Sequence, residues 1–225
     1  MTTDSFTPPD MRLMLVAHHA LCRDLERIRK VLAGPDQDAD YRRGLYEHFG
    51  FWLWFLHHHH VAEDLGLWPA LRERCPEASG LLDDMEADHV HLEELLADAD
   101  QSIREWSVSG SPQLRLQAVG ALARLHEGLS GHLAREESEV LPVVDQFLPD
   151  GEWLRIDKKY FRHGVSLKRL SFLSPWFLDD VPADLASAWT DPLPAPILWM
   201  QRHRWQQAYT RRTEPLWRPL NACLR

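Results

Sequence analysis

Histidine and glutamate stand four residues apart twice in this sequence, as His59 with Glu63 and as His132 with Glu136. On a helix, residues i and i+4 lie on one face one turn apart, so each pair can present an imidazole nitrogen and a carboxylate in the same direction. Both groups bind divalent metals, and a buried glutamate is rare unless it is paired or acts as a ligand. The spacing therefore predicts two matching halves of a metal site.

The two pairs belong to an internal repeat. A shift of 73 residues places FLHHHHVAEDLGLWPAL (55–71) on GLSGHLAREESEVLPVV (128–144), and a proline follows each glutamate six residues later. A shift of 71 residues places His18 on His89, together with three apolar positions around it. Each half is therefore a helix with one histidine followed by a helix with the His-x-x-x-Glu pair.

The repeat supplies four imidazoles and two carboxylates that can all point toward the axis of a helix bundle. Two imidazoles per metal and two bridging carboxylates suit a pair of borderline divalent ions, iron above all, and leave coordination positions free for a small ligand. The predicted metal ligands are His18, His59, Glu63, His89, His132 and Glu136.

The run of four histidines at 57–60 is internal and flanked by apolar residues, unlike a terminal purification tag. Within it, His60 and Asp64 also stand four residues apart, but the repeat places Leu133 opposite His60 and breaks the match. His19 fails the same comparison. We expect the following histidines to lie at the surface, in the core, in a pocket or behind the ligands rather than to bind the metal: His19, His57, His58 and His60.

Helical spacing of apolar residues predicts an all-α fold, an antiparallel up-down-up-down four-helix bundle with short connections. Asp10 can cap the first helix, and Pro69 is expected to bend or end the second because proline lacks a backbone donor. The predicted bundle covers 10–148, and its helices are 10–33, 41–73, 79–106 and 112–148.

The character of the chain changes after the bundle. The segment 149–225 is rich in proline and contains six of the ten tryptophans, so it cannot stay solvated at low cost. We expect a helical and irregular C-terminal extension that wraps the bundle, with a short helix near 151–164 and a last helix at 197–212. It would either cover an apolar face or shape a pocket over the metal site.

Charge and composition narrow the function classes. Residues 1–150 carry 13 Lys and Arg against 27 Asp and Glu, whereas 151–225 carry 12 against 7, so the basic extension is expected to lie on the acidic body. This balance argues against nucleic acid as a partner. No secretory signal or membrane-spanning segment is recognisable, and three scattered cysteines favour a reducing cytoplasm.

The motifs HHHHVAEDLGLWPAL, DHVHLEELL and HLAREESEVLP resemble the hemerythrin family, in particular its HHE cation-binding branch. The resemblance covers about residues 10–148. It implies a non-haem centre of two iron ions with oxo or hydroxo and carboxylate bridges. Such a centre reacts with O2, hydrogen peroxide or nitric oxide.

One position departs from the oxygen-carrying members of that family. The resemblance implies a His-x-x-x-His pair on the third helix of those members, whereas this chain has His89 followed four residues later by Glu93. Three roles for Glu93 remain open: an extra ligand, a proton donor to bound peroxide, or an exposed acid on the helix surface. The departure favours the enzyme-like end of the family over oxygen storage.

Several functions are compatible with these patterns. The first is an oxidoreductase, an oxidase or a peroxide-consuming enzyme, with a small organic substrate or peroxide itself held under the extension. The alternative is reversible binding or sensing of O2 or nitric oxide without turnover. Iron handling and a metal-free structural bundle are weaker interpretations.

Overall fold

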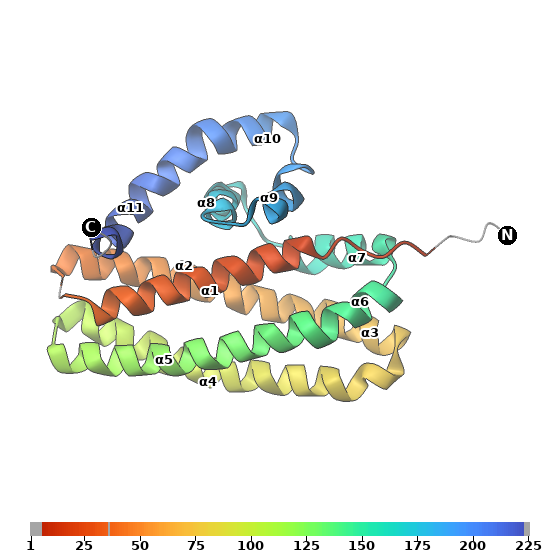
Figure 1. Cartoon of the computed structure of the whole chain (residues 1–225), viewed down its shortest axis with the longest axis horizontal. Helices are drawn as coiled ribbons and strands as arrows, with labels where there is room; N and C mark the ends of the chain where they lie inside the picture. The colour runs from red at the N-terminus through yellow and green to blue at the C-terminus, as the bar shows by residue number, and fades with distance from the viewer. Residues whose placement is uncertain (1–5, 36, 223–225) are drawn as a thin grey trace.

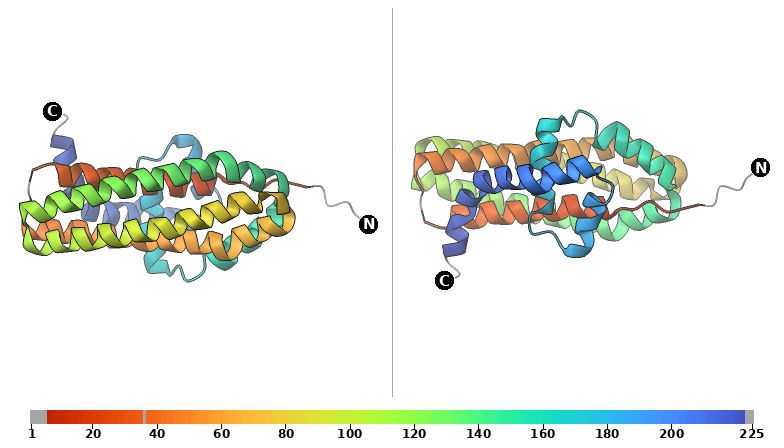
Figure 2. Two further views of the ribbon diagram at one scale, coloured as in Figure 1. Left: turned by 90° about the horizontal axis from the view of Figure 1, so that it is seen from below. Right: turned by 90° about the horizontal axis from the view of Figure 1, so that it is seen from above.

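The computed structural model of the chain describes residues 6–35 and 37–222, and all regular elements in these ranges are helical. Four antiparallel rods lie side by side as predicted (Figures 1 and 2). The first and third are α1 (Arg12–Ala33) and α4 (Ser79–Ser109). The second comprises α2 (Ala39–Ala62), the π-helical turn η1 (Glu63–Leu67) and α3 (Trp68–Arg74), and the fourth comprises α5 (Pro112–Arg135), the π-helical turn η3 (Glu136–Val140) and α6 (Leu141–Phe147).

The helix starts follow ordinary capping rules. The side chain of Asp38 accepts the backbone N–H of Tyr41 and caps α2, while Pro112 opens α5 at a position where no backbone donor is needed. Asp10 accepts the N–H of Arg12 at 3.1 Å, although α1 begins two residues later than predicted.

Pro69, at which the second helix is predicted to bend or end, does not end its rod, and Pro142 does not end the fourth. Pro69 lies at the start of α3 and Pro142 at the start of α6, and a five-residue π turn precedes each of them. Because proline has no N–H to give to the carbonyl four residues earlier, the ladder of α-helical hydrogen bonds cannot continue unchanged. The chain absorbs the defect in a wider turn and the helix resumes.

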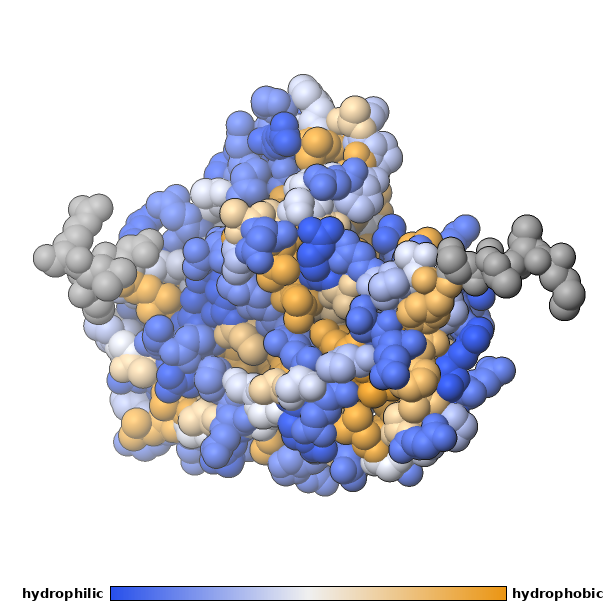
Figure 3. Space-filling model, turned by 45° about the vertical axis from the view of Figure 1, so that its right-hand side comes forward, coloured by the Kyte–Doolittle hydropathy of each residue, from blue (hydrophilic) through white to orange (hydrophobic). Residues whose placement is uncertain are grey.

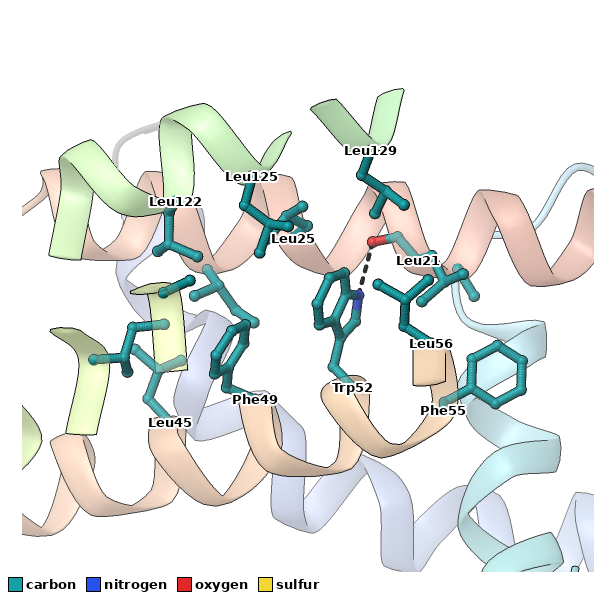
Figure 4. Packing of buried hydrophobic residues seen from close by; sticks show 14 of the residues in the cluster. Leu21, Leu25, Leu45, Phe49, Trp52, Phe55, Leu56, Leu122, Leu125 and Leu129 are labelled. Carbon is teal, nitrogen blue, oxygen red and sulfur yellow. Dashed lines mark hydrogen bonds between the residues drawn. The ribbon is translucent and has the colours of Figure 1, made fainter. Parts of the chain in front are cut away.

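The core consists of two apolar clusters along the bundle. The larger one holds Leu21, Trp52 and Leu125, and the Trp52 indole donates a hydrogen bond to the Leu21 carbonyl at 3.0 Å (Figure 4). The smaller one contains Met14 and Trp68. Between Met14 and Leu21 on α1, His18 is also buried, so polar groups interrupt the core at this level.

The C-terminal extension is helical over most of its length. Its elements are α7 (Asp150–Ile156), the π turn η4 (Asp157–Phe161), α8 (Leu167–Leu178), α9 (Ala183–Thr190), α10 (Ala195–Met200), the π turn η5 (Gln201–Trp205) and α11 (Gln206–Ala222). Figures 1 and 2 show α8 to α11 lying over α1 and α2. The predicted last helix therefore extends to a longer rod, from α10 through α11.

A buried carboxylate ties the extension to α1. Asp24 accepts hydrogen bonds from the Trp176 indole at 2.6 Å, from His48 at 2.7 Å and from Arg23 at 2.9 Å. Burial alone would raise the pKa of Asp24, but the charge of Arg23 and these hydrogen bonds outweigh it and lower the pKa. The ionised carboxylate thus joins α1, α2 and α8.

The ion pairs between the extension and the bundle do not follow the expected attraction of a basic extension to an acidic body. Two short ion pairs run the other way, from Arg27 of the bundle to Asp179 and from Arg74 of the bundle to Glu152, both at 2.6 Å. A contact in the expected direction, from Arg212 to Glu47, is longer at 3.9 Å. Specific pairs at the interface, rather than the net charges of the two segments, orient the extension.

Close packing also joins the extension to the first half of the bundle. A Cβ atom at Gly66 of η1 would lie 2.5 Å from the ring of Tyr160 in η4, so only glycine admits that ring. Apolar side chains show on the surface beneath the extension, among polar ones (Figure 3).

Among the described residues, no helix has the length and apolarity needed to cross a membrane.

Candidate metal centre

Four buried histidines from four rods meet as two pairs. The Nε2 atoms of His18 and His59 lie 3.2 Å apart, and those of His89 and His132 also lie 3.2 Å apart. Two imidazole nitrogens on one metal, with bonds of about 2.1 Å at about 90–110°, are separated by about 3.0–3.4 Å. Each pair therefore has the spacing of two ligands on a shared ion.

Glu63 connects the two histidine pairs. Its side chain is fully buried, with Oε1 lying 3.1 Å from His59 Nε2 and Oε2 lying 3.6 Å from His89 Nε2. One carboxylate oxygen thus faces each pair. This is the arrangement that a bridging carboxylate needs.

Glu136 occupies the matching position in the second half, but a single oxygen of its carboxylate lies nearest to both histidine pairs. It is also fully buried, and its Oε2 lies 3.3 Å from His18 Nε2 and 4.0 Å from His132 Nε2. The four oxygens of Glu63 and Glu136 are buried without a hydrogen bond of normal geometry. Because an unpartnered buried carboxylate is costly, these oxygens fit a cation as their missing partner.

The buried acids and histidines of the cluster shift one another's pKa values. Burial and the neighbouring carboxylate of Glu136 raise the pKa of Glu63 well above its ordinary value. Burial alone would lower the pKa of His18, but Glu136 outweighs it and raises the pKa to about 9. Burial and the charge of His18 lower the pKa of His59, so this imidazole is neutral, as a metal ligand must be.

Two further carboxylates hold the outer nitrogens of the histidine rings. His89 Nδ1 lies 2.7 Å from Asp64 and His18 Nδ1 lies 2.8 Å from Glu137. Such partners orient a ligating imidazole and direct its other nitrogen to the metal. Sequence reasoning missed both roles, although an acidic residue directly follows the glutamate of each His-x-x-x-Glu pair.

The π turns begin at the two buried glutamates. The N–H of Trp68 bonds to the carbonyl of Glu63, and the N–H of Leu141 bonds to that of Glu136, each spanning five residues. The same proline-induced turn therefore shapes both halves of the site. π turns are rare and are often found at functional positions.

His60 also lies in the cluster, in one of the places that the sequence left open for it. It is 5% exposed, its ring stacks on His89 with centroids 4.0 Å apart, and it meets the His132 ring edge-on at 5.3 Å. The alternative pairing of His60 with Asp64 does not occur, since Asp64 binds His89. The reason is geometric: adjacent residues of α2 face two different neighbouring helices.

The remaining histidines of the run take different places. His57 is exposed, and His58 donates a hydrogen bond to the Phe161 carbonyl of the extension at 2.6 Å. His19 is half-buried beside the extension.

Glu93 lies outside the cluster, on the outer surface of α4, so of its three suggested roles the exposed acid fits its position and the extra ligand and proton donor do not. Its side chain is 67% exposed and lies 4.0 Å from the exposed His57. On α4 the buried stripe passes through His89 and Leu92, which leaves Glu93 at the outer edge of the helix.

A cavity of about 350 Å³ lies between the bundle and the extension and reaches the site at His59. Its wall combines α1 and α2 with η4, α8 and α9, and it is mostly apolar. The polar groups on it are His58, His59, Asp157 and Arg162. Its size is within the range of small-molecule sites.

Comparisons with known proteins agree with this geometry. The family model described as the hemerythrin HHE cation binding domain matches residues 11–144, which include all six predicted ligands. No curated protein and no solved structure matches the chain. The match spans more than half of the chain, and the chain therefore belongs to the hemerythrin HHE cation-binding family.

Proposed function

We propose that this protein is a non-haem diiron oxidoreductase that consumes O2 or hydrogen peroxide. The observation that carries the proposal is the pairing of His18 with His59 and of His89 with His132 across two buried carboxylates. Four imidazoles and two carboxylates suit iron among the first-row metals. In this proposal Glu63 and Glu136 would hold the two irons together with the four histidines.

When bound, a pair of iron ions supplies electrons and Lewis acidity for the reduction of O2 or peroxide. The chain supplies the positions. Asp64 and Glu137 fix the rings of His89 and His18, while the two apolar clusters on either side of the site exclude water. Hydrogen bonds and charges inside such a site act at low dielectric and are stronger than in water.

The substrate class that fits the cavity is a small, largely apolar organic molecule. Phe55, Leu173 and Phe177 line its wall, and Asp157 is paired with Arg162 at 2.6 Å, which leaves few free polar groups. The cavity touches His59, so a molecule held there lies next to one of the two proposed iron positions. This supports an oxidase with an organic substrate over a site that meets peroxide alone.

A second candidate function is reversible binding or sensing of O2 or nitric oxide without turnover. The exposure of Glu93 favours it, because the enzyme interpretation had placed an acid at that position.

A reducing cytoplasm remains the proposed location. Cys22 and Cys75 are free thiols, which is typical of such a compartment. Cys223 lies outside the described residues.

The test is to load the apoprotein with iron(II) without oxygen, measure the iron per chain, and add O2 or hydrogen peroxide with ascorbate as reductant. We expect two irons per chain and many molecules of oxidant consumed per chain. Uptake of one O2 per chain that is reversed by flushing with argon would overturn the enzyme proposal in favour of the second candidate. Fewer than two irons would overturn both.

Ala188 provides the test of the cavity. It lines the cavity from α9 and is far along the chain from the proposed ligands, so Ala188→Phe should fill the space and leave both irons in place. We expect oxidation of a small apolar substrate to fall about tenfold or more, whereas consumption of peroxide stays near the wild-type rate. Equal activity on both substrates would exclude the cavity as the substrate site.

A further inference from the structure

The internal repeat places different residues directly after the ligating histidine of each half. His60 follows His59, whereas Leu133 follows His132, and both side chains are buried. The rest of the donor set is matched between the halves. The imidazole of His60 is therefore an addition to one side of the site, the side of His89 and His132.

The position of His60 is close to a metal held by that pair. One ligand atom from each of His60, His89 and His132 lies within 4.8 Å of the others. The rings of His60 and His89 are nearly parallel, at 12°, with centroids 4.0 Å apart. The nitrogen lone pairs of two parallel rings point in parallel directions and do not converge on one metal ion. His60 therefore lies next to the metal position instead of sharing it with His89.

The ring of His60 has an unfilled hydrogen-bonding site. Its Nε2 is buried and has no partner among the described residues. An imidazole carries at least one N–H in either protonation state, so this ring can donate a hydrogen bond. An apolar residue of similar place, such as Leu133 in the other half, would avoid the cost of an unpartnered buried nitrogen.

Resting on the diiron proposal above, we infer that His60 donates a hydrogen bond to the small anionic or oxygenic ligand that binds at the His89–His132 metal. The hydrogen-bond donor that the sequence suggested at Glu93 is then an imidazole on α2. Among the described residues, the other metal position has no equivalent imidazole and instead has the apolar cavity beside His59. The two iron positions are thus inequivalent: one favours a polar small ligand and the other faces the organic pocket.

The experiment uses azide as the probe, a small anion that accepts hydrogen bonds. Full-length protein is loaded with two irons, oxidised to iron(III), and titrated with azide by visible absorption. His60→Leu places the residue of the second half in the first, and His60→Gln keeps an N–H donor. His57→Leu is the matched control, because His57 is in the same run but exposed.

We expect His60→Leu to keep two irons per chain and to bind azide about tenfold or more weakly, as for a lost hydrogen bond to a charged group. His60→Gln should recover most of the affinity, and His57→Leu should match the wild type. Unchanged azide affinity in His60→Leu would overturn the inference, and so would loss of one iron, which would make His60 a direct ligand. Failure of the wild type to hold two irons would instead overturn the proposed function.

Discussion

The two halves of the bundle, residues 12–74 and 79–147, build the same metal donors on different surroundings. Each provides a single histidine, a His-x-x-x-Glu pair, a π turn that starts at the glutamate, and an acidic residue that binds a histidine of the other half. The matched parts are those that hold a metal pair. The parts that differ decide what can reach it.

Phe55 and Gly128 show the difference most clearly. They are equivalent in the repeat, yet Phe55 points toward the extension (Figure 4). There it contacts Trp176 and Phe177. A Cβ atom at Gly128 would lie 3.0 Å from the side chain of Leu95, so glycine allows α5 to approach α4 closely. One side of the bundle is therefore sealed by close helix packing, and the other carries aromatic side chains that need a cover.

The same contrast explains where the extension binds. Asp24, which anchors it, is replaced by Leu95 at the equivalent place of the second half. Gly66, which admits the ring of Tyr160, is replaced by the exposed Glu139. Only the first half has both an anchor and a seat for the extension.

The largest effect should come from removing a ligand, and it should be the same in both halves. His59→Ala and His132→Ala each delete one nitrogen of a 3.2 Å pair, so each should lower the iron content from two to one or fewer per chain. The loss of iron affinity should be larger than the loss of about 10–100-fold that is expected when an outer carboxylate is removed. Metal analysis after gel filtration measures this, and two irons retained by either variant would remove that residue from the ligand set.

Asp24→Asn tests the anchor, which exists in one half alone. Removing a buried charge that Arg23, His48 and Trp176 all contact should lower the free energy of unfolding at pH 7 by about 3–5 kcal/mol. Because the pKa of Asp24 is lowered on folding, its contribution is complete above the unfolded value near about 4 and is lost as the pH falls further. The difference in unfolding free energy between wild type and Asp24→Asn, measured by urea unfolding, should therefore become smaller below about pH 4.

Asp180→Asn is the control for this experiment. Its carboxylate is 77% exposed and lies 3.7 Å from Arg27, so its removal should change stability by less than about 1 kcal/mol. A gap between wild type and Asp24→Asn that stays constant down to pH 2 would contradict the ionised anchor.

Substituting the outer carboxylates should lower metal affinity equally in the two halves, and by less than substituting a ligand does. Asp64→Asn and Glu137→Gln each weaken the partner of one outer histidine nitrogen, so each should reduce metal affinity about 10–100-fold without loss of the fold. Competition with a chelator gives both values. A large effect in one half and none in the other would mean that the repeat extends only to the ligands.

The sequence alone was sufficient for the four-helix bundle and for the six side chains that the structure brings together. Both depend on periodicity: i and i+4 share a helix face, and a repeat shows which face is used. The outer carboxylates Asp64 and Glu137 could have been found from the same repeat, because both follow a predicted ligand directly.

Periodicity leaves a side chain's place open where neighbouring helices decide it. Repeat symmetry could not place His60, because α2 lies against both α1 and α4 and its adjacent residues face different partners. Glu93 is four residues after His89, but the crossing of α4 with its neighbours turns that position outward beside His57. The anchor of the extension joins Asp24 to a residue 152 positions away, a contact that no local pattern encodes.

The smallest expected effect concerns the glycines of the sealed side. Gly131 is exposed in α5 with open space around it, so Gly131→Ala should raise the free energy of unfolding by about 0.5–1 kcal/mol, because alanine restricts the unfolded chain and favours the helix. Gly128→Ala makes the same change in the same helix, but its new methyl group meets Leu95 at 3.0 Å. Urea unfolding should therefore rank Gly131→Ala above Gly128→Ala, with the wild-type iron content in both. Equal stabilisation by the two substitutions would show that α4 and α5 can separate at no cost. The close packing of α4 and α5 would then not explain why the extension and its cavity are found on the opposite side of the bundle.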